Sequence, residues 1–523
     1  MLQFKTPEQA AQWLRQRGAR RLHTDSRKVG AGDAFLAWPG ARHDGRKHVD
    51  ASLQRGAAAC LIEAQGFQQG LTTAMTSACA TYEHLKSACG PIAAAYYEHP
   101  SRHMEVLALT GTNGKTSCAW WLAQALVRLG QRCAMVGTLG LGEVVTASDG
   151  QPRLEGVATG LTTPDAVLFQ GALRDFVQAG VKSCVIEASS IGLVEGRLQG
   201  TRIHLALFTN FTQDHLDYHG DMAAYWQAKR QLFQWPALEL AIIGIDDPKG
   251  SELAAELRRE RPDVRVWTYG LSAQADIRAS QVRWQPGVAD TGTWGQQLTL
   301  TEGDHQADMQ IPWVGEHNVL NVLAVIAALR ALGHAFERAV SVCKDLQPVP
   351  GRMQAITHTG SPLAVIDYAH TPDALDKALQ ALRPLAQMRS GRLWCVFGCG
   401  GDRDRGKRAE MGRVAQALAD RVLLTSDNPR TEDPMAIIRD IRLGTNAQEH
   451  NVQVQLDRAL AIAQALQEMS EAKTQSAHKR ADFRFHEAVL EASDNMFFLQ
   501  LTRQLIDQMI LVVLIQDRRY PVG

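Results

Sequence analysis

The sequence contains no apolar run of the roughly 20 residues that a membrane-spanning helix requires. Its first residues lack a basic stretch followed by an apolar segment, which is the pattern of a secretion signal. It also lacks an excess of charge of either sign, because 55 lysines and arginines balance 55 aspartates and glutamates. No net field therefore attracts the chain to nucleic acid or to a membrane surface. We expect neither a membrane span nor a nucleic-acid partner.

Paired cysteines are missing as well. The nine cysteines are odd in number, scattered, and never spaced as C-x-x-C. This usage is typical of reduced thiols, so we expect a cytoplasmic protein. We also expect it to be a monomer. Internal repeats and low-complexity blocks are also absent from the sequence. With 523 residues, 45% of them hydrophobic and 21% charged, the chain has the composition of a globular protein of about three domains.

What the sequence does contain is a glycine turn between an apolar strand and a helix. Residues 106–121 read V-L-A-L-T-G-T-N-G-K-T-S-C-A-W-W. The first four predict a buried parallel strand, the turn follows, and a helix opens with Ser117. The turn glycines let backbone N–H groups approach phosphates, Lys115 neutralises charge, and the Thr116 hydroxyl suits Mg²⁺. We predict a phosphate cradle for ATP, formed by Gly111, Thr112, Asn113, Gly114, Lys115, Thr116 and Ser117.

This cradle differs from the usual P-loop in one position. A glycine normally stands five residues before the second loop glycine, and here that position is Leu109. The loop is therefore a shorter variant. A plain glycine turn is the alternative, which the G-K-T ending in a strand–helix context disfavours.

Further strands and helices alternate beyond the cradle. Strands are predicted at Cys133–Gly137, Cys184–Glu187 and Leu205–Thr209, and a helix follows Leu161, with Thr162 or Thr163 as its N-cap and Pro164 at its first position. This order predicts an α/β fold with a parallel, doubly wound sheet. Polar residues at the carboxyl ends of such strands point into a ligand crevice. Thr116, Glu187 and His215 are therefore interpreted as one metal–nucleotide site, although each alone is typical of a structural role.

The first hundred residues form a smaller unit. Glu8–Gly18 is predicted as an amphipathic helix that buries Ala11, Trp13 and Leu14, and Ala34–Trp38 as a strand. A helix at Pro91–Glu98 leads into the cradle strand. Two polar loops, Thr24–Arg27 and residues 40–46, either hold a nucleotide-like ligand or are ordinary surface loops.

The chain resembles the Mur ligase family of peptidoglycan synthesis from its N-terminus to about residue 465. The resemblance depends on an ordered set of motifs: G-T-N-G-K-T (111–116), T-T-P-D (162–165), E-A-S-S (187–190), D-H-L-D-Y-H-G (214–220), G-E-H-N-V-L-N (315–321), P-G-R-M (350–353), D-Y-A-H-T-P-D-A-L (367–375), F-G-C-G-G-D-R-D-R-G-K-R (397–408) and D-N-P-R (427–430). The set is most similar to the MurE branch. Within that branch D-N-P-R marks the members that add meso-diaminopimelate, whereas lysine-adding members differ there.

The resemblance implies three domains and one reaction. Residues 1–100 would bind the UDP end of the substrate, 101–348 would form the central P-loop ATPase, and 349–468 a Rossmann-like domain for the incoming amino acid. The reaction would join meso-diaminopimelate to UDP-N-acetylmuramoyl-L-alanyl-D-glutamate, with ATP going to ADP and phosphate through an acyl phosphate. Two Mg²⁺ ions and domain closure are expected.

The resemblance also assigns roles to single residues. Thr116 and Glu187 would hold one Mg²⁺ and His215 would lie near the second. Lys229 matches a carbamylated lysine that ligates Mg²⁺; an exposed helical lysine is the alternative. Asn318 and Asp367 would meet the nucleoside and Arg352 the phosphates of ATP. The substrate contacts would be Thr24, Ser26, Ala41, Arg42 and His43 for UDP, Thr162, Thr163, Ser189 and Arg197 for the muramoyl dipeptide, and Arg403, Asp427, Asn428, Pro429 and Arg430 for diaminopimelate. Glu195 stands where the branch often has glutamine.

Residues 469–523 depart from the family. The G-K-G-H-E loop that usually follows the last strand and helps hold the far end of diaminopimelate is absent, and residues 472–510 are predicted as helix. Residues 481–495 resemble a fragment of the ligand-binding domain of GntR-type regulators, as expected of a recombined or frameshifted ending. Leu511–Ile515 favours a terminal strand. Two alternatives remain open. The chain is either a degenerate relative that binds nucleotide without ligating, or a ligase that resembles folylpolyglutamate synthase.

Overall fold

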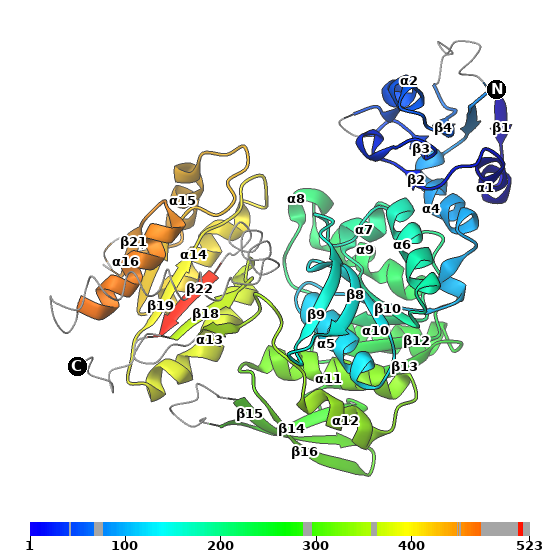
Figure 1. The fold of residues 1–523 in the computed structure, drawn as a ribbon. Helices are drawn as coiled ribbons and strands as arrows, with labels where there is room; N and C mark the ends of the chain where they lie inside the picture. The colour runs from blue at the N-terminus through cyan, green and yellow to red at the C-terminus, as the bar shows by residue number, and fades with distance from the viewer. Residues whose placement is uncertain are drawn as a thin grey trace. The chain divides into compact units, whose positions relative to one another are not determined.

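The computed structural model describes residues 1–40, 43–66, 77–285, 295–356, 363–446, 448, 451–471 and 511–515 (Figure 1). By its contacts the chain divides into two units. Unit 1 comprises Met1–Asn210, Ala223–Asp276 and Ala324–Leu346; unit 2 comprises Phe211–Met222, Ile277–Leu323 and Gln347–Gly523. The two units interleave along the sequence. The division expected from the sequence, into domains at residues 1–100, 101–348 and 349–468 and an unusual ending at 469–523, remains a prediction.

The N-terminal sheet of unit 1 is parallel throughout. Its strand order is β1 (Leu2–Phe4), β5 (Cys79–Tyr82), β4 (Ala59–Glu63), β3 (Ala34–Ala37) and β2 (Leu22–His23). The predicted strand at residue 34 is confirmed as β3. The predicted first helix is confirmed as α1 (Pro7–Gln16), capped by the Thr6 hydroxyl and burying Ala11, Trp13 and Leu14. Apolar spacing was therefore a sufficient signal here.

The helix expected at Pro91–Glu98 was predicted to start too late. It is α4 (Leu85–Tyr96), and Pro91 lies inside it. Its N-terminus is capped by a distant residue, because the Glu63 carboxylate accepts hydrogen bonds from the backbone N–H groups of His84 (3.1 Å) and Leu85 (2.7 Å). A carboxylate at a helix N-terminus satisfies donors that have no partner within the helix. The local sequence gives no sign of this cap.

The central sheet of unit 1 carries the phosphate cradle. Its strand order is β13 (Arg265–Gly270), β12 (Leu240–Gly244), β11 (Leu205–Phe208), β6 (Glu105–Thr110), β10 (Ser183–Glu187), β7 (Cys133–Gly137), β8 (Gly140–Thr146) and β9 (Pro152–Val157). All neighbours from β13 to β7 are parallel. The predicted α/β fold and the strands at 133–137, 184–187 and 205–209 are confirmed. The antiparallel hairpin β8–β9 was not predicted.

Two helix starts in this region differ from the prediction. Helix α5 (Lys115–Arg128) begins two residues before Ser117, with Gly114 as its N-cap. Helix α6 (Ala166–Gln178) is capped by Asp165, whose carboxylate accepts from two backbone N–H groups. Neither predicted threonine is the cap. The Thr163 hydroxyl is already engaged, because it donates to the Glu187 carbonyl (2.7 Å) and accepts from the Ser189 N–H (3.0 Å).

Unit 2 contains three antiparallel strands and a mixed sheet. The three strands are β14 (Ile277–Gln285), β15 (Gly295–Glu302) and β16 (His305–Ile311). The mixed sheet, called the C-terminal sheet, has the order β17 (Gln354–Ile356), β18 (Leu363–Asp367), β22 (Leu511–Ile515), β19 (Leu393–Phe397), β20 (Arg421–Leu424) and β21 (Val452–Val454). Helices α13 (Pro372–Met388) and α14 (Gly406–Leu418) follow β18 and β19. The repeated strand–helix order gives the Rossmann-like character expected of this region.

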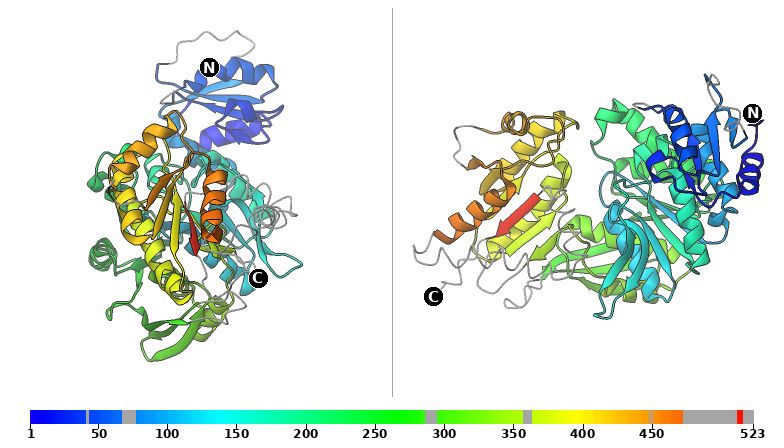
Figure 2. Two further views of the ribbon diagram at one scale, coloured as in Figure 1. Left: turned by 90° about the vertical axis from the view of Figure 1, so that its left-hand side faces the viewer. Right: turned by 45° about the horizontal axis from the view of Figure 1, so that its top comes forward.

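The predicted terminal strand is confirmed, and it is central to its sheet. Strand β22 pairs antiparallel with both β18 and β19, and Figures 1 and 2 show it as the red arrow inside the C-terminal sheet. Val512 packs with Ala461, Ala465 and Met469 of α16 (Arg458–Glu471) on one face, while Val513 contributes to the core on the other. The helical prediction for residues 472–510 and the regulator-like segment 481–495 lie outside the described residues. Among the described helices, none is long and apolar enough to cross a membrane.

Candidate active site

The cradle loop has the backbone geometry that its glycines allow. Gly111 adopts φ 143° and Gly114 φ 85°, both in the region that residues with a side chain rarely occupy. A Cβ on Gly111 would lie 1.9 Å from Thr209 Oγ1. The loop is thus packed tightly against the end of β11, and glycine is required at position 111 for space as well as for conformation.

Hydrogen bonds fix the shape of this loop. Lys115 Nζ donates to the carbonyls of Gly111 and Thr112, each over 2.8 Å. From the end of β11, Asn210 accepts from the N–H groups of Asn113 (2.9 Å to Oδ1) and Thr112 (2.9 Å to its carbonyl). A basic side chain and the N-terminus of α5 therefore meet at one preformed loop, which is a suitable cradle for phosphate.

Thr116 and Glu187 are brought together at the carboxyl ends of β6 and β10. The Thr116 hydroxyl donates to Glu187 Oε2 over 2.9 Å, and the Thr138 N–H donates to Glu187 Oε1 over 2.8 Å. The Glu187 side chain is 1% exposed. A hydroxyl oxygen and a carboxylate are oxygen donors, the kind of ligand that Mg²⁺ takes, so this pair fits a magnesium ion at the cradle.

Lys229 lies against the same loop. Its ammonium donates to the Gly111 carbonyl over 2.7 Å and lies 4.4 Å from the centre of the Tyr225 ring. The Tyr225 hydroxyl in turn lies 3.2 Å from Thr112 Oγ1. The residue is 1% exposed, so the alternative of an exposed helical lysine is wrong.

The residues predicted to meet the muramoyl dipeptide form one hydrogen-bonded group. Thr163 Oγ1 lies 2.9 Å from Ser189 Oγ, Arg197 donates to the Thr163 carbonyl over 2.9 Å, and Thr162 Oγ1 lies 3.3 Å from Thr138 Oγ1. Glu195 pairs with Lys86 over 2.7 Å. The group is contiguous with the Glu187 end of the cradle through Thr138 and Thr163.

Of the residues predicted to meet UDP, Thr24, Ser26 and His43 are described, whereas Ala41 and Arg42 lie outside the described residues. Thr24 and Ser26 follow β2, and His43 follows β3. Asp25 accepts from the Arg27 guanidinium (2.8 Å), whose hydrogen bond holds the pKa of that carboxyl at about 2. The loops thus lie at the carboxyl edge of adjacent parallel strands, as the ligand-loop interpretation requires.

In unit 2, Arg352 and Asp367 lie close together at the end of β18. The Arg352 guanidinium stacks 4.4 Å from the centre of the Tyr368 ring, and Asp367 Oδ2 accepts from the Met353 N–H over 2.8 Å. Burial raises the pKa of the Asp367 carboxyl, and the positive charge of Arg352 opposes that shift. Asn318 is buried, and its side-chain amide donates to the Val314 carbonyl over 2.8 Å.

The residues predicted to hold diaminopimelate lie on two loops that touch. The Arg430 guanidinium donates to the Gly401 carbonyl, and the Gly401 N–H donates to the Asn428 carbonyl over 3.1 Å. A Cβ on Gly401 would lie 1.9 Å from the Pro429 carbonyl oxygen. Burial raises the pKa of the Asp427 carboxyl, although its ion pair with Arg458 opposes the shift. The loops after β19 and β20 thus present Arg403, Asp427, Asn428, Pro429 and Arg430 from one edge of the C-terminal sheet.

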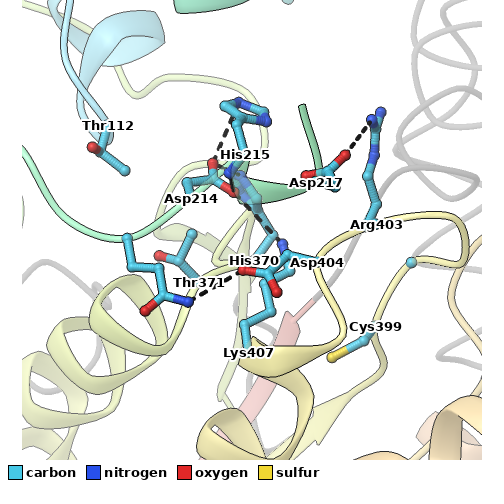
Figure 3. A network of polar contacts seen from close by, with 12 residues as sticks. Thr112, Asp214, His215, Asp217, His370, Thr371, Cys399, Arg403, Asp404 and Lys407 are labelled. Carbon is cyan, nitrogen blue, oxygen red and sulfur yellow. Dashed lines mark hydrogen bonds and ion pairs between the residues drawn. The ribbon is translucent and has the colours of Figure 1, made fainter. Parts of the chain in front are cut away.

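A buried ionic cluster around Asp214 was not predicted from the sequence. Its carboxylate lies 3.3 Å from His370 Nε2 and 3.8 Å from Lys407 Nζ (Figure 3). Burial alone would raise the pKa of the Asp214 carboxyl, but the hydrogen bond from His370 and the charges of His370, His215 and Lys407 hold that pKa well below its usual range. All four residues stand in the motifs that carry the resemblance. Their clustering, however, requires knowledge of the tertiary structure.

His215 lies beside this cluster in unit 2. Its ring Nε2 is 3.4 Å from Asp214 Oδ2, and its backbone adopts φ 53°. Among the described residues, no group of three or more histidine, cysteine, aspartate or glutamate side chains could hold a metal ion.

The fold and the cradle define a class: an α/β protein that binds a nucleoside triphosphate through a glycine loop beside a buried carboxylate. Three family descriptions of Mur ligases match the chain, namely the Mur ligase family catalytic domain (residues 20–97), the Mur ligase middle domain (109–329) and the Mur ligase glutamate ligase domain (351–475). The chain belongs to the Mur ligase family. The FCD domain matches residues 445–521 and overlaps the third of these.

Curated relatives cover most of the chain. A UDP-N-acetylmuramoyl-L-alanyl-D-glutamate–2,6-diaminopimelate ligase of Acidovorax sp. (strain JS42) is 52% identical over 88% of this chain and 90% of its own length. A protein of the same name from Coxiella burnetii is 41% identical over 85% of this chain and 87% of its own length.

Solved structures agree with the family. A structure of a UDP-N-acetylmuramoyl-L-alanyl-D-glutamate–2,6-diaminopimelate ligase is 33% identical, with a TM-score of 0.59 over 86% of each chain. A folylpolyglutamate synthase of Mycobacterium tuberculosis shares the fold, with 20% identity and a TM-score of 0.56 over 74% of this chain and 89% of its own.

Proposed function

We propose that the chain is an ATP-dependent ligase that joins meso-diaminopimelate to UDP-N-acetylmuramoyl-L-alanyl-D-glutamate in peptidoglycan precursor synthesis. The observation that carries the proposal is the 52% identity with a relative named for this reaction, over 90% of that relative's length. The D-N-P-R motif at 427–430, expected of diaminopimelate-adding members, supports the choice of amino acid. A cytoplasmic location and a monomeric state remain predictions.

The reaction has to bring two anions together. The γ-carboxylate of the D-glutamate attacks the terminal phosphoryl group of ATP and displaces ADP, and an amine of diaminopimelate then displaces phosphate from the acyl phosphate. Lys115 and the N-terminus of α5 would bind the ATP phosphates and offset their charge. Thr116 and Glu187 would hold a Mg²⁺ ion there, which when bound neutralises phosphate charge. His215 and Lys229 are proposed for a second ion.

Lys229 is proposed to work as a carbamate. The carbamate converts an ammonium into an anion but keeps one N–H on Nζ, so the hydrogen bond to the Gly111 carbonyl can persist. The position of Lys229 supports the proposal, because its Nζ contacts the cradle loop that would hold the phosphates and their magnesium ion. No other lysine is proposed for this role.

The amino acid is proposed to lie at the carboxyl edge of the C-terminal sheet. Diaminopimelate carries two ammonium and two carboxylate groups, and the loops there offer Arg403 and Arg430 for carboxylates and Asp427 for an ammonium group. ATP is proposed to contact Asn318 and Asp367 through its nucleoside and Arg352 through its phosphates. The UDP-sugar dipeptide is proposed to contact the loops of the N-terminal sheet and the group around Thr163.

The second candidate function is nucleotide binding without ligation, by a degenerate member of the family. The observation that favours it is the unusual ending, in which an FCD match replaces the family's last residues. The alternative of a folylpolyglutamate-synthase-like ligase has less support, because that likeness, at 20% identity, concerns the fold alone.

The test is phosphate release by the full-length protein with ATP and Mg²⁺. The UDP-muramoyl dipeptide and meso-diaminopimelate are supplied separately and together, and the product is identified by mass. Release that requires both substrates and yields the tripeptide product supports the proposal. Lys115→Ala is the control, expected to cost about 3–4 kcal/mol of transition-state stabilisation. Nucleotide binding without product, under conditions where a curated relative is active, would favour the degenerate alternative.

A further inference from the structure

Residues 211–222, called here the connecting segment, join two stretches of unit 1 in the sequence but belong to unit 2 by their contacts. Side chains at three positions attach the segment to the carboxyl edge of the C-terminal sheet. Gln213 donates to Asp404 Oδ2 over 3.2 Å, Asp217 lies 3.9 Å from the Arg403 guanidinium, and Asp214 contacts His370 and Lys407 (Figure 3). The partners are on the loops that follow β18 and β19, or in the first turn of α14.

Asp214 is the most deeply buried of these three, with 4% of its surface exposed. A buried carboxylate is tolerated only when it is paired. Here it lies between Lys407 Nζ, at 3.8 Å, and His370 Nε2, at 3.3 Å. The other ring nitrogen of His370, Nδ1, lies 3.0 Å from the Tyr368 carbonyl oxygen, so oxygens face the ring at both ends and fix its plane. The carboxylate is thus held by the Lys407 ammonium and by a His370 ring whose plane is fixed.

Asp214 also holds the backbone of the next residue. Its Oδ1 accepts from the His215 N–H over 2.9 Å, and His215 adopts the left-handed backbone conformation immediately before helix α8 (Leu216–His219). That conformation is unfavourable for a residue with a side chain and persists only where its surroundings enforce it. The Asp214 carboxylate therefore contacts both the backbone and, at 3.4 Å, the ring of His215.

We propose that Asp214 is a positioning residue. Anchored by His370 and Lys407, it fixes the connecting segment to the amino-acid loops and sets the direction of the His215 ring for its metal ion. The part that concerns metal binding rests on the proposed function. The arrangement couples the loop that carries Arg403, a candidate for gripping the amino acid, to the histidine that serves the phosphate chemistry.

The experiment compares Asp214→Asn with the parent in the full-length protein. The substitution keeps the size of the side chain but removes the charge that Lys407 and His370 bind. Two measurements need no turnover: amide hydrogen exchange of residues 211–222, and the affinity for Mn²⁺ of the protein loaded with a non-hydrolysable ATP analogue, read by electron paramagnetic resonance. We expect exchange in the segment to rise at least tenfold and Mn²⁺ affinity to fall at least fivefold.

The matched control is Asp420→Asn. Asp420 is a carboxylate of the same sheet, but it accepts from Arg383 and from the Leu393 N–H at the amino end of β19, the opposite edge. It should change neither measurement. If Asp214→Asn fails to fold, Lys407→Met removes one anchor and leaves the carboxylate in place, and should move both measurements in the same direction by at least threefold.

The possible results distinguish a failure of the Asp214 proposal from a failure of the proposed ligase function. Unchanged exchange and unchanged Mn²⁺ affinity in the folded variant would overturn it. Raised exchange with unchanged Mn²⁺ affinity would also overturn it, because Asp214 would then support the fold without positioning His215. A parent that binds Mn²⁺ and the ATP analogue but forms no product would refute the ligase function and leave both measurements valid. In an active parent, we expect Asp214→Asn to lower kcat at least tenfold, while KM for ATP stays within threefold.

Discussion

Thr116 and Glu187, 71 positions apart in the sequence, meet through a hydrogen bond of 2.9 Å from the threonine hydroxyl to Glu187 Oε2. The strands that end beside them, β6 and β10, are direct neighbours in parallel register, with Leu109 opposite Glu187. The cradle and its carboxylate are therefore one rigid element of the sheet. The strand that lies on the other side of β10 ends in Gly137, and this residue makes the position of Glu187 testable.

The first prediction concerns Gly137→Ala. An added Cβ would lie 2.2 Å from Glu187 Oε1 and 2.8 Å from its Cδ, so the carboxylate must leave the position in which Thr116 binds it. We expect the rate of phosphate release to fall at least tenfold, which raises the barrier by ~1.4 kcal/mol or more. KM for the UDP-muramoyl dipeptide should change by less than about threefold. The measurement is steady-state kinetics over a range of Mg²⁺ concentrations.

Gly171→Ala is the control for this substitution. Gly171 lies in helix α6, and its added Cβ would meet only the Tyr97 ring at 3.4 Å or more, an ordinary contact. Replacement of glycine by alanine within a helix is usually neutral or stabilising. If Gly137→Ala turns over at the rate of the parent, the observed position of the Glu187 carboxylate is not required for catalysis.

The second prediction concerns Lys229. We expect Lys229→Ala to lose turnover at least a hundredfold, and a short carboxylate such as acetate to restore part of it, because the missing anion can be supplied from solution. The parent grown or incubated with ¹³C-bicarbonate should show a carbamate carbon by NMR. Lys249→Ala is the control, since Lys249 also lies over an aromatic ring, 5.8 Å from that of Trp226, but is partly exposed and pairs with Glu252. A Lys229→Ala protein with the parent's turnover would rule out the carbamate.

The third prediction concerns the choice of amino acid. Diaminopimelate differs from lysine by a distal carboxylate, and Arg430 offers a bidentate partner for it. A site built for that pair discriminates against lysine, since the guanidinium would be left without its partner. We expect kcat/KM for meso-diaminopimelate to exceed that for L-lysine at least a hundredfold in the parent, and the preference to vanish in Arg430→Ala. Arg430→Lys, which keeps the charge without the planar fork, should retain only part of it. Equal efficiencies for both amino acids in the parent would refute the assignment.

Much of the fold could be predicted from the sequence, because the strands of the central sheet are short apolar runs and α1 has clear amphipathic spacing. The cradle could be predicted from the G-K-T ending in its strand–helix context. What could not be predicted depends on residues far apart in sequence. Glu63 caps α4 from the end of β4, and Thr163 is unavailable as a cap because it binds Ser189. The Asp214 cluster likewise combines three segments, each of which looks ordinary when taken alone.

The fourth prediction concerns acid stability. The hydrogen bond from Arg408 lowers the pKa of the Glu432 carboxyl from its ordinary value of 4.5 to about 2. Because the folded-state pKa is lowered, the stabilisation is present above the unfolded-state pKa and is lost as the pH falls through the folded-state value. We expect Glu432→Gln to lower the urea midpoint at pH 7, and the difference from the parent to shrink between about pH 4.5 and 2. Glu410→Gln, which removes the exposed pair with Arg413, should show little difference at any pH. A difference that does not depend on pH would exclude the ionic explanation.

The last prediction concerns the ending of the chain. Strand β22 runs antiparallel to its neighbours: Leu511 pairs with Asp367 and Phe397 at their carboxyl ends, and Ile515 pairs with Leu363 and Leu393 at their amino ends. The chain therefore leaves the strand at the edge opposite the candidate amino-acid loops. A loop that follows this strand, as the G-K-G-H-E loop follows the usual last strand, would start at the wrong edge to hold diaminopimelate.

We therefore expect the present protein to keep ATP and UDP-substrate binding, but to bind diaminopimelate weakly. Replacing everything after Gln467 by a MurE-type ending should raise kcat/KM for diaminopimelate at least tenfold, about 1.4 kcal/mol. The graft must bring its own strand, because β22 separates β18 from β19. Deletion of residues 472–523 without a replacement should unfold the C-terminal sheet. So should Val513→Asp, which places a charge at a fully buried position and typically costs more than about 4 kcal/mol. If the graft changes nothing and the present chain already ligates at rates typical of enzymes, the unusual ending is no defect, and the orientation of β22 has no consequence for the amino-acid site.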